Sequence, residues 1–259
     1  MGAVITSRRE RSACLADPRA YAGRLGLAAA DVDAFAAMVP DLAALTDSFV
    51  NKRQGILRRA LPHTFVLLGA PARALLADYT AGTPQTEALS DDPLGFGAAL
   101  LQLAVDSAAT VEAGPAIAEL AAFELALCRA FWQPAALELV PERSSARTAP
   151  EGFDRNRLLQ LHPSVDVRHF DHDLRQLRSY TVTELSGLPP DPCHLLFFQN
   201  GQRRDPTILR LFPAVAAALA RLREQGPQSA AELCSGVDQP ERILVTLARL
   251  QSQGVLEWA

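Results

Sequence analysis

Apolar and polar residues alternate with two different periods along this 259-residue chain. From residue 17 to residue 132, apolar side chains recur every three or four positions, which is typical of helices that bury one face. Proline stands at or near the start of most of these segments, where its missing N–H leaves no hydrogen bond unmade. The predicted helices span residues 31–38, 41–60, 63–68, 71–79, 93–111 and 115–132. The pattern therefore predicts a helical bundle over residues 17–139.

Two other segments lack the helical period. Residues 1–16 show no periodicity, so we expect a flexible, extended N-terminus there. Residues 140–157 are polar, contain two prolines and are poor in helix-forming residues, which indicates a linker. The chain is thus expected to consist of a helical domain and a separate C-terminal module over residues 158–259.

The C-terminal module begins with short runs that have the period of strands. Residues 164–170 alternate loosely between apolar and polar positions and predict one strand. The apolar runs 194–199 and 207–212 predict two more. Asn200-Gly201 follows the first of these runs and favours a hairpin, because both positions tolerate positive φ.

Three helices and a short terminal strand follow the hairpin. Pro213 suits the first turn of a helix, which ends at a glycine-proline pair. Ser229 and Glu232 have the spacing of a capping box that opens the second helix. The third helix starts near Asp238, and residues 255–258 return as a strand. The sequence therefore predicts a mainly α protein with a small α+β module of winged-helix-like form, built from three strands and three helices.

The third helix of this module has one apolar face and one polar face. Ile243, Leu244, Leu247 and Leu250 recur at helical spacing, and Arg242, Thr246, Arg249 and Gln253 form a stripe on the opposite side. The apolar face should pack on the other helices. Three interpretations of the polar stripe stay open: a solvated surface, a helix that enters a groove of DNA, or one wall of a site that holds a peptide against a sheet edge.

Charge argues against nucleic acid as the partner. The chain carries 25 basic and 29 acidic residues, a formal net charge of -4. From His194 onward, seven arginines and six acidic residues leave a net charge of +1 (7 − 6). This charge is weak for a module that must bind the phosphates of a DNA duplex.

Cysteine spacing and hydropathy predict a cytoplasmic protein. Cys14, Cys128, Cys193 and Cys234 are far apart, which indicates reduced thiols in place of a disulfide framework or a zinc site. The N-terminus carries charges without a following apolar run of signal-peptide length. No stretch approaches the roughly 18 apolar residues that a membrane span needs, so no membrane is expected as a partner.

Candidate catalytic and metal-binding residues are few. His169, Asp171, His172 and Asp173 are the densest set of potential metal ligands, but neighbouring residues of a strand point in different directions, so a polar strand end is favoured. The chain has no G-x-S-x-G motif, no phosphate-binding loop and no dinucleotide-binding glycine motif after a strand. The residues alone therefore predict neither a catalytic site nor a metal site. They predict a module that binds another molecule.

Two passages resemble one known family. The first runs from Asn51 to Gly69, where a helix rich in arginine leads into Leu61-Pro62-His63-Thr64-Phe65. The second combines residues 161–165 with residues 190–201. Both passages are similar to the partner subunits of multinuclear non-haem iron-dependent oxidases, the TglI, MbnC and HvfC type. These oxidases belong to pathways that make ribosomally synthesised and post-translationally modified peptides (RiPPs).

The resemblance implies a non-catalytic subunit of a heterodimer. Iron would reside in a separate TIM-barrel oxidase subunit, so no cofactor is expected in this chain. The chain would bind a precursor peptide and present its cysteine to the oxidase, which in one member type excises the cysteine β-carbon on the route to 3-thiaglutamate. The residues that the resemblance brings into contact with the oxidase are Arg53, Arg58, His63 and Phe65.

The resemblance also implies that the C-terminal module is a RiPP recognition element. An extended leader peptide would add a strand to the edge of its sheet and lie beside the third helix. The implied peptide-binding residues are Arg204, Thr207, Ile208, Leu209, Arg210, Leu211, Arg242, Thr246 and Arg249. Arg204 and Arg210 would suit an acidic leader.

Two other hypotheses stay open. The chain could be a winged-helix DNA-binding transcriptional regulator with a helical sensing domain, and an affinity for duplex DNA that falls steeply with salt would support this. It could also be an enzyme in its own right. Stoichiometric metal that is lost on replacing His169 and His172 would support that third hypothesis.

Overall fold

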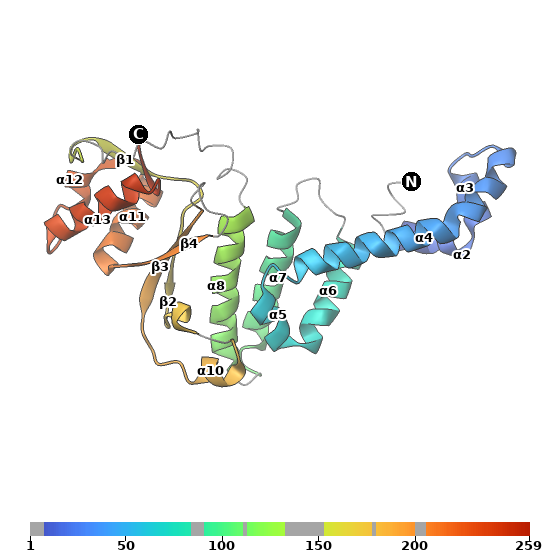
Figure 1. Cartoon of the computed structure of the whole chain (residues 1–259), viewed down its shortest axis with the longest axis horizontal. Helices are drawn as coiled ribbons and strands as arrows, with labels where there is room; N and C mark the ends of the chain where they lie inside the picture. The colour runs from blue at the N-terminus through green and yellow to red at the C-terminus, as the bar shows by residue number, and fades with distance from the viewer. Residues whose placement is uncertain (1–7, 84–90, 111–112, 133–152, 178–179, 200–205) are drawn as a thin grey trace. The chain divides into compact units, whose positions relative to one another are not determined.

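A computed structural model describes residues 8–83, 91–110, 113–132, 153–177, 180–199 and 206–259 (Figure 1). The described residues are mostly helical, with short antiparallel strands near the C-terminus, as the sequence pattern predicts. The chain divides into two compact units, an N-terminal unit of residues 1–121 and a C-terminal unit of residues 122–259. The proposed extents of a helical domain (17–139) and a C-terminal module (158–259) stay predictions.

The described part of the N-terminal unit is built from helices. These are α2 (Arg8–Ala16), α3 (Pro18–Arg24), α4 (Ala29–Leu57), α5 (Pro62–Leu68), α6 (Ala70–Gly82), α7 (Asp91–Ser107) and the beginning of α8 (Gly114–Trp132). Proline lies in the first turn of α5, α6, α7 and α8, as the sequence predicts. In that turn the proline interrupts no intrahelical hydrogen bond.

Residues 8–16 form helix α2 in place of the extended segment that the missing periodicity suggested. The cause is tertiary packing, because Cys14 is fully buried in a small core that also contains Tyr21 and Phe35. The Tyr21 hydroxyl donates a hydrogen bond to Glu10 at 3.0 Å, which fixes α2 against α3. Residues 1–7 lie outside the described part of the chain.

Helix α4 continues through Pro40, whereas the sequence predicted two helices that meet there. Phe35 and Val39 on the N-terminal half are buried in the core shared with α2 and α3. Arg53 and Leu57 are buried on the C-terminal half, which lies against α6 and α7. Packing at both ends holds the helix continuous despite the hydrogen bond that proline removes.

The C-terminal unit contains the end of α8, several strands and further helices. Its strands are β1 (Leu158–Leu161), β2 (Asp166–Phe170), β3 (Cys193–Phe198), β4 (Thr207–Leu211), β5 (Gln228–Ser229) and β6 (Leu256–Trp258). Its further helices are the 3-10 helix η1 (Leu174–Gln176), α10 (Val182–Ser186), α11 (Pro213–Gln225), α12 (Ala230–Leu233) and α13 (Pro240–Ser252). Strands β2, β3, β4 and β6 and the three last helices lie where the sequence predicts elements, whereas β1 and β5 were not predicted.

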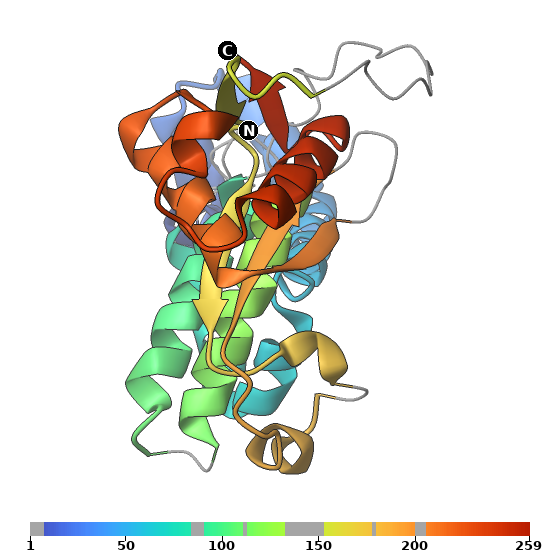
Figure 2. The ribbon, with the colours of Figure 1, turned by 90° about the vertical axis from the view of Figure 1, so that its left-hand side faces the viewer.

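Strands β2, β3 and β4 form an antiparallel sheet in that order, with helices on both faces (Figures 1 and 2). On one face, the Phe123 ring of α8 lies 5.9 Å from the Phe170 ring and 5.5 Å from the Phe197 ring. On the other face, Leu196 and Phe198 belong to the core formed with α11 and α13. Burial on both faces explains why β3 is apolar almost throughout.

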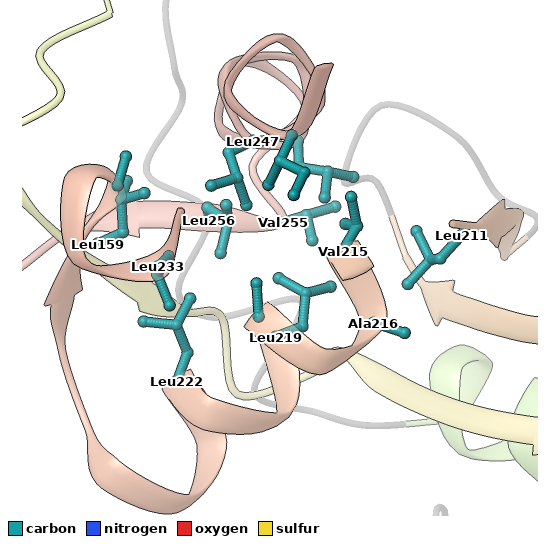
Figure 3. Packing of buried hydrophobic residues seen from close by; sticks show 14 of the residues in the cluster. Leu159, Leu211, Val215, Ala216, Leu219, Leu222, Leu233, Leu247, Val255 and Leu256 are labelled. Atoms are coloured by element: carbon teal, nitrogen blue, oxygen red, sulfur yellow. The ribbon is translucent and has the colours of Figure 1, made fainter. Parts of the chain in front are cut away.

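A second antiparallel sheet has the order β5–β1–β6. The predicted terminal strand is therefore present, but its partner is β1 and not the hairpin. Leu159 of β1 and Leu256 of β6 are buried and pack towards Leu219 and Leu222 of α11 (Figure 3). This core joins the second sheet to the three C-terminal helices.

Two local predictions in this unit have different outcomes. The capping box is confirmed, because the Ser229 hydroxyl accepts from the Glu232 N–H while the Glu232 carboxylate accepts from the Ser229 N–H. The start of α13 differs, since its N-cap is Gln239, with φ 56°, and not Asp238.

The end of the predicted linker belongs to the C-terminal unit. The Phe153 ring lies 5.5 Å from the Trp258 ring, and Arg155 forms an exposed ion pair with Glu241 at 3.0 Å. Residues 140–152 lie outside the described part.

Candidate functional site

Strand β4 is an edge of its sheet. Its residues pair with β3 from Thr207, opposite Phe198, to Leu211, opposite His194. Among the described residues no strand pairs with its other edge. Part of the N–H and C=O groups of Thr207–Leu211 therefore point away from the sheet, where an extended chain can bind them.

The side chains of β4 divide between the two faces of the sheet. Residues directly opposite each other in an antiparallel pair share a face. Thr207 and Leu209 thus lie on the face that packs on α11 and α13, together with Leu211, which is buried there. Ile208 and Arg210 lie on the other face. Of the predicted peptide-binding residues on β4, only three share the side of α13.

Helix α13 borders the end of this strand. Its apolar face is buried as predicted, and Arg242 and Arg249 are exposed on the polar side. The Arg242 guanidinium stacks over the Phe212 ring at 5.0 Å and also donates to the Gln239 side chain at 2.6 Å. Thr246 is half-buried, and its hydroxyl donates to the Arg242 carbonyl at 2.9 Å.

Phe212 connects β4 to α11 and contacts α13 through Arg242. It directly follows β4, precedes Pro213 of α11 and is 57% exposed. Val245 on α13 is 70% exposed. We call the open edge of β4 together with Phe212, Arg242, Val245, Thr246 and Arg249 the β4–α13 surface. It combines main-chain groups that pair with no strand among the described residues with exposed apolar and cationic side chains.

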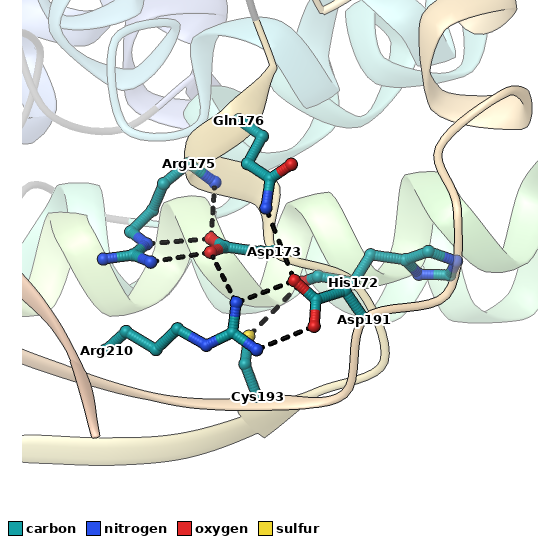
Figure 4. A network of polar contacts seen from close by, with 7 residues as sticks. All are labelled: His172, Asp173, Arg175, Gln176, Asp191, Cys193 and Arg210. Carbon is teal, nitrogen blue, oxygen red and sulfur yellow. Dashed lines mark hydrogen bonds and ion pairs between the residues drawn. The ribbon is translucent and has the colours of Figure 1, made fainter. Parts of the chain in front are cut away.

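Arg210 has charged partners that the sequence did not predict, and its contact with a peptide stays a prediction. Its guanidinium forms two hydrogen bonds of 2.7 Å with Asp191 and one of 3.3 Å with Asp173 (Figure 4). These carboxylates neutralise its charge on the face of the sheet opposite α13. Arg210 therefore fastens β4 to the preceding connector and is already engaged where an acidic leader was expected to bind it. Arg204 lies outside the described residues.

Arginines also lower the pKa of both carboxylates in this network. Hydrogen bonds from Arg175 are the main cause that lowers the pKa of buried Asp173 to about 2, against an opposing effect of burial. The hydrogen bond from Arg210 lowers the pKa of Asp191. Next to them, the Cys193 thiol contacts the His172 carbonyl at 3.7 Å, and burial raises the pKa of this thiol. The network is a set of satisfied charges that ties η1 to β3 and β4.

The predicted set of potential metal ligands does not converge. His169 lies directly opposite His194 on β3, with ring centroids 5.1 Å apart, and its Nδ1 is 4.0 Å from Asp171. Asp173 instead binds arginines. Within the described ranges, no three histidine, cysteine or acidic side chains are grouped as a metal site.

The four residues expected to contact an oxidase lie on α4, on the turn that follows it and on α5, but one of them is buried. Arg53 donates to both carboxylate oxygens of Asp92 at 2.7 Å and to the Thr83 carbonyl at 2.8 Å. Its side chain is inside the N-terminal unit, so the interface role expected for Arg53 is replaced by a structural one.

The other three residues of this set are accessible to different degrees. Arg58 is exposed and lies 5.9 Å above the half-buried Phe65 ring, and His63 is exposed at the start of α5. Their role as an interface stays a prediction.

Sequence reasoning missed Phe212, Val245 and Asp191. The exposure of Phe212 had a usable signal. This aromatic residue stands directly before Pro213, where the strand ends, so it does not have to continue the alternation of buried and exposed strand positions. Val245 interrupts the polar stripe of α13. The partnership of Asp191 with Arg210 had no signal, since the two are 19 residues apart and meet only in the folded unit.

No protein-family model matches the chain, and no curated protein is significantly similar to it. Among the described residues, no helix is both long enough and apolar enough to cross a bilayer.

Proposed function

We propose that this protein is a non-catalytic subunit that binds a ribosomal precursor peptide and presents its cysteine to a separate iron-dependent oxidase. One observation carries the peptide-binding part: β4 pairs with no strand on its outer edge among the described residues, and it leads into exposed Phe212, which lies under the exposed Arg242 of α13. An enzyme's reacting groups are not needed for this role.

The unpaired edge of β4 favours an extended peptide as the ligand. Such a peptide gains main-chain hydrogen bonds as an added strand, and its alternate side chains contact whatever borders the edge. On the α13 side these neighbours include Phe212 and Arg242. In this proposal, β2–β3–β4 with α11, α12 and α13 form a winged-helix-like recognition domain of the RiPP type.

The charges beside the edge favour an acidic peptide with an apolar residue. Arg242 and Arg249 are exposed on the polar side of α13, and Phe212 offers an apolar surface under Arg242. Glu241, the neighbouring acid on α13, is paired with Arg155. An acidic side chain of the peptide is therefore attracted more to α13 than to β4, where Arg210 is already neutralised.

The oxidase part of the proposal rests on the resemblance of residues 51–69, 161–165 and 190–201 to partner subunits of such oxidases. In this proposal iron and the reacting oxygen belong to the TIM-barrel partner, and the cysteine reaction is of the β-carbon excision type. This chain contributes binding and positioning of the peptide.

Co-purification tests the assignment as a subunit. The tagged chain is co-expressed with the products of neighbouring genes, and the recovered complex is analysed for protein and iron. We expect a stable heterodimer with an iron-containing barrel protein. A chain that is recovered alone, free of iron, and that retards duplex DNA would establish the regulator hypothesis instead.

Binding of the precursor peptide tests the surface. The probe is a fluorescent leader segment of the precursor peptide that co-purification recovers, and affinity is measured by anisotropy. We expect Arg249→Ala and Arg242→Ala to weaken binding roughly tenfold, as for loss of a charge-assisted contact. Arg73→Ala, an exposed arginine on α6, is the matched control. Equal losses in the control, or none at α13, would contradict the proposed surface.

Hydrogen exchange tests the added strand separately. Amide exchange at Thr207–Leu211 should slow when the peptide binds, because outward N–H groups of β4 gain partners. Peptide binding without protection of β4 would mean that a different surface is used.

A further inference from the structure

Helix α4 carries an exposed apolar stripe in the middle of its length. Met38, Leu45 and Phe49 are 49%, 49% and 47% exposed. Their spacing of seven and four residues places them on one side of the helix, within about 40° of each other. Three large apolar side chains so aligned form a surface typical of helix association.

The helices that pack on α4 use a different face. The centre of its buried face lies about 80° around the helix axis from the centre of the stripe. This buried face consists of Phe35, Val39, Thr46, Arg53 and Leu57. Pro40 is exposed and lies roughly opposite the stripe. The proline therefore does not interrupt the stripe, and the described helices of the N-terminal unit leave about half of each stripe residue in water.

The stripe has the period of a coiled coil and charged ends. Asp31, Met38, Leu45 and Lys52 follow each other at intervals of seven, the heptad spacing. Asp31 and Lys52 are exposed at its two ends, about 32 Å apart along the axis. One end of the stripe is thus acidic, its centre apolar and its other end basic.

The stripe on one copy of α4 is complementary to the same stripe on a second copy that runs in the opposite direction. If two copies of α4 meet antiparallel around a twofold axis between residues 41 and 42, Asp31 lies opposite Lys52, Ala34 opposite Phe49, and Met38 opposite Leu45. Opposite charges meet at both ends, and the largest side chain meets the smallest. In a twofold interface each such contact occurs twice.

We propose that a second copy of this chain docks on the stripe, so that α4 packs antiparallel on α4. The complementarity of charge and size selects a second copy over an unrelated partner, since an unrelated helix need not satisfy both. This inference does not depend on the proposed peptide-binding function, because the stripe lies on a different unit from the β4–α13 surface.

Asp41 is the least favourable residue of this arrangement. It lies at the margin of the stripe next to the twofold axis, so its carboxylate comes close to that of Asp41 in the second copy. Like charges across such a seam weaken association. Asp41→Asn should therefore tighten the dimer by a few-fold.

Sedimentation equilibrium of the full chain over a range of concentrations tests the proposal. We expect a reversible dimer that Leu45→Asp weakens at least a hundredfold, because two carboxylates would enter its centre. Val105→Asp is the matched control, since Val105 is an equally exposed apolar residue (49%) on α7 of the same unit. This control should leave the dimer unchanged.

Charge reversal tests the antiparallel register. Asp31→Lys alone, and Lys52→Asp alone, should each weaken the dimer about tenfold, because each places like charges at both ends. Mixing the two single variants restores complementary ends, and so does combining both changes in one chain. Both the mixture and the double variant should regain the original affinity.

Three results would overturn the proposal. They are a chain that stays monomeric at all concentrations, a dimer that tolerates Leu45→Asp, and charge reversals that do not rescue each other. Thermal unfolding followed by circular dichroism checks that each variant is folded. If Leu45→Asp does not fold, the exposed charge reversals at Asp31 and Lys52 decide whether the dimer forms as proposed.

Discussion

Arg53 illustrates how burial decides the role of a charged residue. A guanidinium removed from water requires a carboxylate close by, and Asp92 supplies both of its oxygens. The sequence places Arg53 among exposed-looking arginines, and its partner is 39 residues away. Its burial could not be predicted from local pattern, because it depends on how α4 and α7 pack.

Arg53→Ala should therefore destabilise the N-terminal unit. Removing one member of a buried pair leaves Asp92 without compensation, at a cost of about 3 kcal/mol. Urea unfolding measures the loss. Arg58→Ala is the matched control on the same segment, and its exposed contact with Phe65 should contribute well under about 1 kcal/mol. Similar losses in both variants would mean that Arg53 is not held as the structure shows.

Asp173 makes stability depend on pH. Its pKa is about 2 in the folded chain, below the ordinary value of 3.8, chiefly because Arg175 donates hydrogen bonds to it. A lowered pKa stabilises the fold by about 2 kcal/mol above pH 4, and this contribution is lost as the pH falls from about 4 to about 2. The folded state therefore weakens with acid in that window.

Asp173→Asn removes this contribution. At pH 6 the variant should unfold at lower urea concentration than the parent, and the difference should shrink as the pH approaches 2.5. A difference that stays constant across this range would show that the ionised carboxylate is not the cause.

At the scale of elements, local signals predict the C-terminal helices and the hairpin strands well. Pro213 begins α11, and the capping box at Ser229 opens α12, because such signals act within one turn of the chain. Predictions from local signals fail where packing between distant segments decides the structure. Pro40 suggests a helix start, yet the cores at both ends of α4 keep the helix continuous.

In the β4–α13 surface, too, some features follow from the local sequence pattern and others depend on contacts between distant segments. The polar stripe of α13 follows from helical period alone, and its arginines are exposed as expected. The face occupied by Arg210 follows from the register with β3, which the sequence could not give. The period of two then places Arg210 away from α13.

Ser229→Ala should destabilise the C-terminal unit by about 1 kcal/mol. The hydroxyl accepts from the Glu232 N–H at 3.2 Å, and its loss leaves that donor unpaired at the start of α12. Thermal or urea unfolding measures the change. Ser252→Ala, at the exposed end of α13, should have a much smaller effect, since its hydroxyl only donates to the Arg249 carbonyl. Equal effects would contradict a specific capping role.

At the scale of the whole molecule, composition predicts the fold class but not the strand pairing. A high apolar content with few aromatic residues favours helices, which dominate the described residues. The pairing of β6 with β1 joins segments about 100 residues apart, and no local pattern encodes it. Core formation around α11 brings them together.

The burial of all four cysteines has a consequence for a protein proposed to handle a peptide thiol. Cys14, Cys128, Cys193 and Cys234 are free and buried, and burial is the main cause that raises the pKa of each thiol, to about 12 for Cys128. Thiol–disulfide exchange requires an accessible thiolate, and these groups offer neither accessibility nor charge at neutral pH.

A disulfide-forming reagent such as Ellman's reagent should therefore release almost no chromophore from the native chain and four equivalents after denaturation. Fast reaction of any native cysteine would contradict this burial. If the chain binds a precursor peptide as proposed, the cysteine of that peptide meets no accessible thiol with which it could form a mixed disulfide.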